Sequence, residues 1–216
     1  LHAVDVLAGL VRRNGIRECE QRLAGFGWQH ASIRYAKPGP ALAAGVERAL
    51  AACPDAALLL LENHGIVVAG GSLQEIDAML ADIGVRFAPP ALYLPDAPAA
   101  PATIAAGDGI MLAPVRDPAG HFHSLASDPQ WLRRLQQDWA LYPDHPVFLG
   151  REAAIYADLR EAIAAARAGR MLPGRPQFIA GVGTFSVSPL SAARLAQLRC
   201  YQDVLERQSA DSVLDS

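Results

Sequence analysis

Ala56-Ala-Leu-Leu-Leu-Leu-Glu-Asn-His-Gly-Ile-Val-Val-Ala-Gly70 is the stretch of sequence that decides the fold. Its leucine run is too short for a typical buried helix and is flanked by turn residues, so it predicts a strand covered on both faces. Glu62-Asn63-His64-Gly65 then predicts a tight turn, and Ile66 to Ala69 a returning strand. A sheet with a buried strand of this kind is typical of an α/β protein.

Further elements are predicted on either side of this stretch. They are a surface helix over 3–13 with a left-handed stop at Asn14-Gly15, a short strand within 26–35, a helix that follows Pro40, and a helix that runs from the capping box Ser72-Leu-Gln-Glu75 to about Val85. Strands and helices therefore alternate through the first part of the chain.

The later part has a different composition at its start. Residues 88–109 are rich in Pro and Ala, almost uncharged and without periodicity, which is typical of a linker or a wrapped loop. The elements predicted beyond it are a helix capped by Asp128, a strand over 146–149, a helix from about Arg151 to Ala168, a strand over 176–180, a strand-to-helix turn at Gly181-Val-Gly183, and a helix from Ser191 to about Arg207. This order favours a small parallel-sheet unit. We predict three parts: 1–88, a linker over 89–127, and a small α/β extension over 128–216.

The composition argues against several classes of protein. The chain has 216 residues, of which 51% are apolar, so it can bury a globular core. A net charge of -3, with Arg scattered evenly among Asp and Glu, gives no basic stripe for nucleic acid. The longest apolar run, Ala56 to Leu61, is far shorter than the roughly 20 residues of a membrane helix, and no signal peptide opens the chain. We therefore expect a cytoplasmic protein with neither a nucleic-acid nor a membrane partner.

The three cysteines and the histidines are the remaining candidates for special chemistry. Cys19, Cys53 and Cys200 form no Cys-x-x-Cys pattern, so we expect reduced core thiols. His64 is a candidate metal ligand, because it follows a rigid strand and Gly65 allows close approach, although a histidine there more often bonds a backbone carbonyl.

The two residues before His64 are candidates for orienting its imidazole through hydrogen bonds. Glu62 and Asn63 are in position to orient the imidazole, and the alternative for Glu62 is simply the polar end of a strand. His121-Phe-His123 is a second His-x-His, but we expect exposed loop histidines there, and we expect His145 to be structural.

Three segments taken together resemble the class II aldolase/adducin family. They are His2-Ala-Val-Asp-Val-Leu, Tyr35-Ala-Lys-Pro-Gly39 and the stretch from Leu59 to Gly70, in the family's order, and the resemblance covers roughly residues 1–87. It implies a three-layer α/β/α domain of which this chain holds a part. The later sequence, with Leu141-Tyr-Pro-Asp-His-Pro-Val-Phe-Leu-Gly150, looks like the carboxy-terminal extension of longer members.

The resemblance also implies a metal site. His2 matches the second member of the family's His-x-His pair and His64 its third ligand to a divalent ion, most commonly zinc. The first histidine of the pair, an acidic catalytic residue and the phosphate-binding loops belong upstream of Leu1. Because the chain opens without Met and directly in an amphipathic segment, we expect that upstream sequence is missing.

The function implied by the resemblance is a metal-dependent carbon–carbon lyase that acts on a small sugar or sugar phosphate. Members of the family commonly form tetramers, so a homo-oligomer is expected. Decarboxylases and epimerases use the same fold, and adducin-like members without metal serve as assembly modules. A further alternative is that the extension binds a small ligand through the turn at Gly181.

Overall fold

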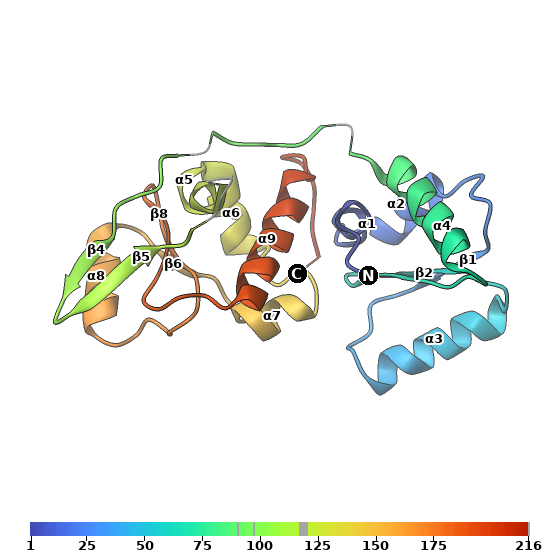
Figure 1. Cartoon of the computed structure of the whole chain (residues 1–216), viewed down its shortest axis with the longest axis horizontal. Coiled ribbons are helices and arrows are strands. Elements are labelled where there is room, and N and C mark those ends of the chain that lie inside the picture. Colours follow the sequence, from blue (N-terminus) through green and yellow to red (C-terminus); the bar gives the residue numbers. More distant parts are fainter. Residues whose placement is uncertain (90, 97, 117–120, 216) are drawn as a thin grey trace. The chain divides into compact units, whose positions relative to one another are not determined.

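The computed structural model describes residues 1–89, 91–96, 98–116 and 121–215, and these form two compact units. Unit 1 comprises Leu1–Leu92, Leu141–Pro143 and Arg207–Asp215. Unit 2 comprises Tyr93–Ala140 and Asp144–Glu206. Figure 1 labels most of the elements of both units. None of the helices in the described part of the chain combines the length and hydropathy of a membrane-spanning segment.

The sheet of unit 1 has three strands in the order β1-β2-β3. They are β1 (His30–Ile33), β2 (Leu58–Leu61) and β3 (Gly65–Val68). β2 pairs parallel with β1 and antiparallel with β3. All four leucines of β2 are buried. The prediction of a strand covered on both faces is therefore confirmed.

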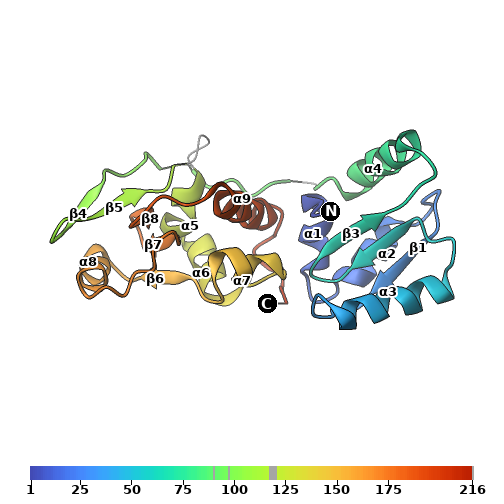
Figure 2. The same cartoon turned by 60° about the horizontal axis from the view of Figure 1, so that its bottom comes forward.

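Helices cover both faces of this sheet. They are α1 (Val4–Leu10), α2 (Gly15–Arg22), α3 (Pro40–Ala52) and α4 (Leu73–Phe87). Because side chains alternate along a strand, Leu58 and Leu60 pack with α1, α2 and α4, whereas Leu59 and Leu61 pack with α3. Figure 2 shows α3 on one side of the strands and α4 on the other. The three-layer α/β/α arrangement is therefore confirmed.

The first helix differs from its prediction. α1 is a core helix and not a surface helix, since Leu7 and Leu10 are fully buried. Asn14 has φ -110°, so the expected left-handed stop does not form, and α2 begins directly at Gly15. A Cβ at position 15 would collide with the carbonyl oxygen of Gly9, so glycine is needed here to let the two helices approach.

The capping box of α4 forms as predicted. The Ser72 hydroxyl accepts a hydrogen bond from the amide of Glu75 at 3.2 Å, and the Glu75 carboxylate accepts one from the amide of Gly71 at 2.8 Å. Two amides at the helix start are thus satisfied by side chains. This fixes where α4 begins after the turn that follows β3.

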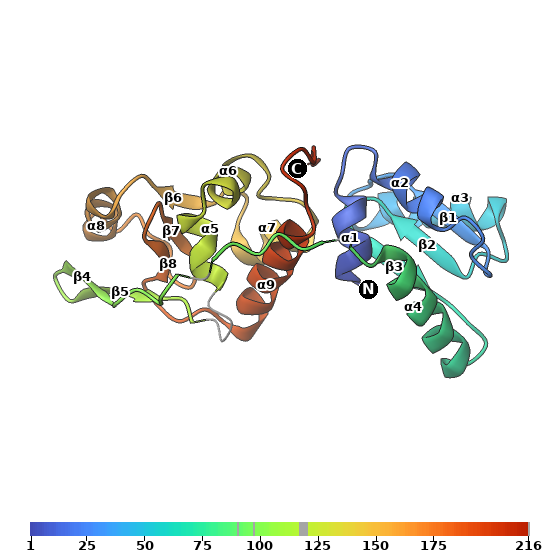
Figure 3. The same cartoon turned by 90° about the horizontal axis from the view of Figure 1, so that it is seen from above.

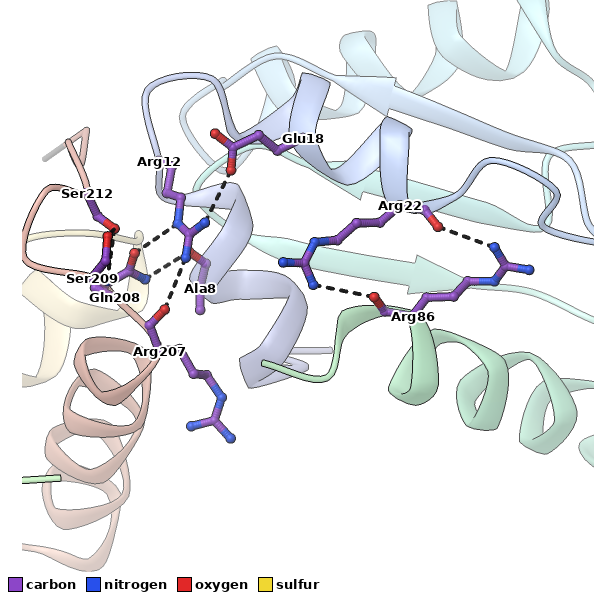
Figure 4. Close-up of polar contacts among 9 residues, drawn as sticks. All are labelled: Ala8, Arg12, Glu18, Arg22, Arg86, Arg207, Gln208, Ser209 and Ser212. Atoms are coloured by element: carbon purple, nitrogen blue, oxygen red, sulfur yellow. Dashed lines mark hydrogen bonds and ion pairs between the residues drawn. The ribbon is translucent and has the colours of Figure 1, made fainter. Parts of the chain in front are cut away.

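The last segment of unit 1, Arg207–Asp215, lies along α1. Arg12 donates to the side chain of Gln208 at 3.0 Å and to the carbonyl oxygen of Arg207 at 3.0 Å, and it also bonds Glu18. The Gln208 amide donates to the carbonyl oxygen of Ala8 at 2.9 Å (Figure 4). Sequence far from the first helix therefore completes unit 1.

Unit 2 contains a five-stranded sheet in the order β4-β5-β8-β7-β6. Its strands are β4 (Ile104–Gly107), β5 (Ile110–Pro114), β6 (Ala154–Tyr156), β7 (Gln177–Ile179) and β8 (Gly183–Ser186). Figure 3 shows β6, β7 and β8 side by side. Among the described strands of unit 2, only β6 and β7 pair in parallel. The prediction of a parallel sheet is wrong, because connections as short as those after β4 and β7 can join only antiparallel strands.

The hairpin β4–β5 lies inside the segment 89–127, which we predicted to be a linker or loop. Its turn is Asp108-Gly109, with φ 51° and 75°, and such a pair is a strong hairpin signal. The hairpin was not predicted, because the low charge and the Pro and Ala content of this segment are typical of a linker or loop. Residues 90, 97 and 117–120 of the same segment lie outside the described residues.

The helices of unit 2 are η1 (His121–His123, a 3-10 helix), α5 (Ser124–Ser127), α6 (Pro129–Gln137), α7 (Asp144–Leu149), α8 (Leu159–Arg167) and α9 (Ala192–Glu206). Asp128 caps α6 as predicted, by accepting from two backbone amides. The strand predicted over 146–149 is the helix α7. The long helix predicted from Arg151 is wrong as well: β6 occupies its start, and Asp158 caps the shorter α8.

Candidate functional site

The site begins where the first residue of the chain pairs with β3. The Leu1 amino group donates to the carbonyl oxygen of Ile66 at 2.8 Å, and the amide of Ile66 donates to the carbonyl oxygen of Leu1 at 3.0 Å. Two reciprocal bonds of this kind are those of an antiparallel strand pair. They place His2 beside the turn that contains His64.

Gly65 makes this approach possible. Its φ of 127° lies in the region that favours glycine, and a Cβ there would collide with the carbonyl oxygen of Leu1. The Asn-His-Gly turn thus needs glycine both for its own backbone and for the neighbouring chain. The sequence-based argument that Gly65 allows close approach is confirmed, and the approaching group is backbone.

The rings of His2 and His64 lie close together. Their centroids are 5.9 Å apart with an interplanar angle of 53°, and both residues are half-buried. Two imidazoles that share one tetrahedral ion, at a metal–nitrogen distance of about 2.1 Å, have centroids roughly 5 Å apart. The observed separation therefore fits a shared ion to within about 1 Å.

The described residues provide these two imidazoles but not a larger ligand set. No group of three or more His, Cys, Asp or Glu side chains suited to a metal ion occurs within the described ranges. A structural zinc site takes four protein ligands and a catalytic one takes three. His2 and His64 thus fit part of a metal site, and further ligands would have to come from other groups.

Asn63 holds distant parts of unit 1 together. Its backbone is left-handed, with φ 53°, which asparagine tolerates better than most residues. Its side-chain amide donates to the carbonyl oxygens of Leu141 at 3.2 Å and Asp215 at 2.8 Å. Both hydrogens of the side-chain amide are thereby donated to backbone carbonyl oxygens. The role of Asn63 in orienting an imidazole stays a prediction.

Glu62 links the ends of two neighbouring strands. One carboxylate oxygen accepts from Arg34 at 3.2 Å, and the other accepts from the amide of Tyr35 at 2.8 Å. These bonds join the end of β2 to the chain that leaves β1. They match the description of Glu62 as the polar end of a strand; an additional role beside His64 stays a prediction.

Tyr142 is a neighbour of the site that the sequence reasoning missed. Its ring centroid lies 5.7 Å from that of His2, and its side chain is only 2% exposed. It belongs to the short segment Leu141–Pro143, which Asn63 binds through Leu141. Since 140 residues separate it from His2 in the sequence, only the three-dimensional structure brings the two rings together.

The second His-x-His does not form a loop site. His121–His123 is a 3-10 helix, in which residues two apart point in different directions, so its two imidazoles do not share a face as they would on a strand. His123 is 1% exposed, and its Nδ1 accepts from the amide of Thr184 at 3.2 Å. The prediction of an exposed histidine is therefore wrong for His123, which has a structural role.

The glycine turn of unit 2 also differs from its prediction. Gly181, with φ 71°, lies in the turn between β7 and β8, which are antiparallel. The turn therefore joins two strands. The prediction that it leads from a strand into a helix is wrong. Because no helix starts there, the helix N-terminus on which a phosphate would rest is missing at this position.

Cys19 behaves as a core thiol. It is buried among the helices of unit 1, and burial raises its pKa to about 12. A thiol with such a pKa stays protonated at neutral pH, so it is a poor nucleophile and a poor metal ligand. The prediction of a reduced core thiol fits Cys19.

Comparison with known proteins gives one match. No curated protein and no solved structure matches this chain. Residues 1–81 match the model of the Class II Aldolase and Adducin N-terminal domain, and this range includes both His2 and His64. Residues 1–81 of unit 1 are therefore similar to a class II aldolase/adducin-type domain.

Proposed function

We propose that this chain is part of a metal-dependent carbon–carbon lyase that acts on a small sugar or sugar phosphate. The observation that carries the proposal is the 5.9 Å separation of the His2 and His64 rings within the residues that match the family. Two half-buried imidazoles held beside one another are a suitable partial ligand set for a divalent ion of the zinc type.

In this proposal His2 and His64 hold the ion. A divalent metal bound by neutral imidazoles supplies Lewis acidity, which stabilises negative charge on a substrate oxygen next to the bond that breaks. The protein's own contribution is position: Leu1 and Ile66 fix His2 through two backbone bonds, and the rigid end of β2 fixes His64. Because the backbone is rigid on both sides, the two imidazoles stay beside one another, where both can bind the same ion.

Metal content tests the proposal. The measurement is the number of zinc-type ions per chain, by mass spectrometry. The protein used includes the first histidine of the expected His-x-His pair, of which His2 is the second. We expect about one ion per chain, and we expect His64→Ala to lose it, because a site that loses one imidazole binds zinc far more weakly. His30→Ala, which alters a half-buried histidine in β1, is the matched control and should keep the ion.

Two further results bear on the alternatives. Metal that is bound equally by the His64→Ala variant would contradict the assignment of His64. Absence of metal from the parent protein would favour an adducin-like assembly module. If metal is present, cleavage of a panel of small sugar phosphates in the retro-aldol direction distinguishes a lyase from a decarboxylase or an epimerase on the same fold.

We also infer a homo-oligomer, by analogy with the tetramers common in the family. Light scattering of the protein after size-exclusion chromatography gives its molar mass directly. A mass of four chains supports a tetramer, and the mass of a single chain contradicts the inference.

A further inference from the structure

Unit 2 contains a pocket of about 500 Å³ at the amino ends of the parallel strands β6 and β7. Its wall is formed by the end of α7, the chain from Gly150 to Ala154 and the segment from Arg170 to Gln177. The volume lies within the range of roughly 300–1,000 Å³ that is typical of small-molecule sites. The pocket is therefore large enough for a metabolite-sized ligand.

Three arginines line this pocket: Arg151, Arg170 and Arg175. Glu152 is the one carboxylate among the lining residues, and it is exposed. In the part of the chain that the structure describes, none of the three arginines forms an ion pair with an acidic side chain. The pocket thus carries a net charge of about +2, and its guanidinium groups are available to an anion.

Part of this wall is fixed by close packing. Gly150 has φ 97°, and a Cβ there would collide with the guanidinium of Arg175, so this cation lies directly against the backbone. The Gly150 carbonyl oxygen accepts from the indole of Trp139 at 2.9 Å in the buried core. The Arg175 guanidinium therefore packs against a backbone that is itself anchored.

The base of the pocket is polar and hydrogen-bonded. Gln177 is buried, and its side-chain oxygen accepts from the Tyr156 hydroxyl at 3.0 Å, while its amide donates to the carbonyl oxygen of Arg175 at 3.1 Å. The Tyr156 hydroxyl oxygen retains the capacity to accept a further bond. Neutral polar groups therefore line the pocket together with the three cations.

We propose that this pocket binds a small phosphate monoester, with the phosphate group between Arg151, Arg170 and Arg175. A phosphate monoester carries about -1.5 to -2 charge at pH 7, which balances the charge of the pocket. Guanidinium groups match phosphate oxygens with paired N–H donors. Since a phosphate group alone fills only a small part of about 500 Å³, the ligand includes an organic portion.

This inference does not depend on the metal centre proposed for unit 1, because every residue that lines the pocket belongs to unit 2. Its subject is a binding site, and it assigns no reaction to the pocket. A ligand here could be a substrate of another activity or a regulator, and the same binding test applies to either.

Calorimetric titration of the full chain tests the site. The probes are glycerol 2-phosphate and inorganic phosphate, with citrate as a phosphate-free anion for comparison, in a buffer of low ionic strength that contains none of the three. We expect both to bind and Arg170→Gln to weaken binding roughly tenfold or more, because it removes charge-assisted hydrogen bonds. Arg170 is exposed, so this variant should fold normally.

Arg175→Gln is the second test variant, and Arg160→Gln is the matched control. Arg160 lies on α8, its side chain is 93% exposed, and it is absent from the pocket. The control should bind like the parent protein. The proposal is overturned if neither probe binds, if Arg160→Gln weakens binding as much as Arg170→Gln, or if citrate binds more tightly than the phosphate ester.

Discussion

A single glycine decides whether His2 and His64 can lie side by side in unit 1. Gly65 ends the turn that carries His64, and the carbonyl oxygen of Leu1 occupies the space that a side chain would need. With any other residue at position 65, either Leu1 would have to move away or the backbone at position 65 would have to adopt a different φ. Since Leu1 precedes His2, displacing it would also move one of the two imidazoles.

Gly65→Ala should therefore destabilise the first unit. We expect a loss of about 2 kcal/mol or more, which combines a strained backbone with a collision. Gly25→Ala is the matched control: Gly25 also has a positive φ, 72°, but has no atom near its added Cβ, so its cost should be only about 1 kcal/mol.

Hydrogen exchange of the Ile66 amide measures the effect of Gly65→Ala directly. This amide donates to Leu1, and it should exchange faster in Gly65→Ala than in Gly25→Ala. Equal exchange rates in the two variants would show that the Leu1 contact contributes nothing beyond backbone strain.

Among the elements of unit 2, α7 and α9 are joined by a cluster of rings. His145 on α7 is 0% exposed, and its ring centroid lies 4.2 Å from that of Trp139 and 4.8 Å from that of Tyr201 on α9. The Tyr201 hydroxyl donates to the carbonyl oxygen of Asp138 at 3.1 Å. Burial lowers the pKa of His145 from 6.5 to about 3.

This pKa makes the stability of unit 2 depend on pH. Between about pH 6.5 and 3 the unfolded chain binds a proton at His145 that the folded chain does not. The contribution of His145 to the free energy of unfolding is therefore fully retained above about pH 6.5. As the pH falls below this value, the free energy of unfolding decreases by about 1.4 kcal/mol per pH unit because of this group. His145→Phe keeps a ring of similar size in the cluster and removes the titration.

Urea unfolding at several pH values measures this effect. It is followed by the fluorescence of Trp131 and Trp139 in a Trp28→Phe background, because Trp28 belongs to unit 1. Trp131 and Trp139 lie in unit 2 and are buried. The free energy of unfolding of the parent protein should fall more steeply below pH 6.5 than that of His145→Phe, whatever the difference between them at pH 8. Parallel pH profiles would rule out His145 as the source.

Elements with a strong local signal were predictable from the sequence. The leucine run of β2, the capping box of α4 and the Asp128 cap of α6 each depend on a few adjacent residues, and all three form as predicted. The strand β6 and the helix α7 were not predictable in this way. Both are short, and packing within unit 2 rather than local propensity decides their conformation.

The candidate site follows the same distinction. His64 could be singled out because its turn follows a buried strand, and His2 because of the family resemblance. Tyr142 could not be found, since its place beside His2 depends on hydrogen bonds from Asn63 to the main chain of Leu141 and Asp215. Contacts between residues so far apart in sequence leave no periodic pattern.

At the scale of the whole molecule, unit 1 is assembled from three separate stretches of chain. The last of these, Arg207–Asp215, contributes the buried side chains of Gln208 and Leu214. It is bonded to Ala8 of α1 and to Arg12, which follows this helix (Figure 4). An ion pair also joins Arg207 to Asp5. A domain boundary at residue 88, as the sequence indicates, leaves these contacts out.

Gln208→Ala tests how far unit 1 depends on this segment. The substitution removes the buried bond to the carbonyl oxygen of Ala8 and the acceptor for Arg12, so we expect unit 1 to lose roughly 1–3 kcal/mol of stability. Val213→Ala, which shortens a half-exposed side chain of the same segment, is the control and should cost less than about 0.5 kcal/mol.

Hydrogen exchange of the amides of α1 and of α8 in the full chain reports on the two units separately. In Gln208→Ala the α1 amides should exchange faster while the α8 amides keep their rates, because Ala8 and Arg12 both belong to unit 1. Equal acceleration in both helices would mean that the two units unfold together. Unchanged exchange in α1 would mean that the first stretch of unit 1 is stable without its last one.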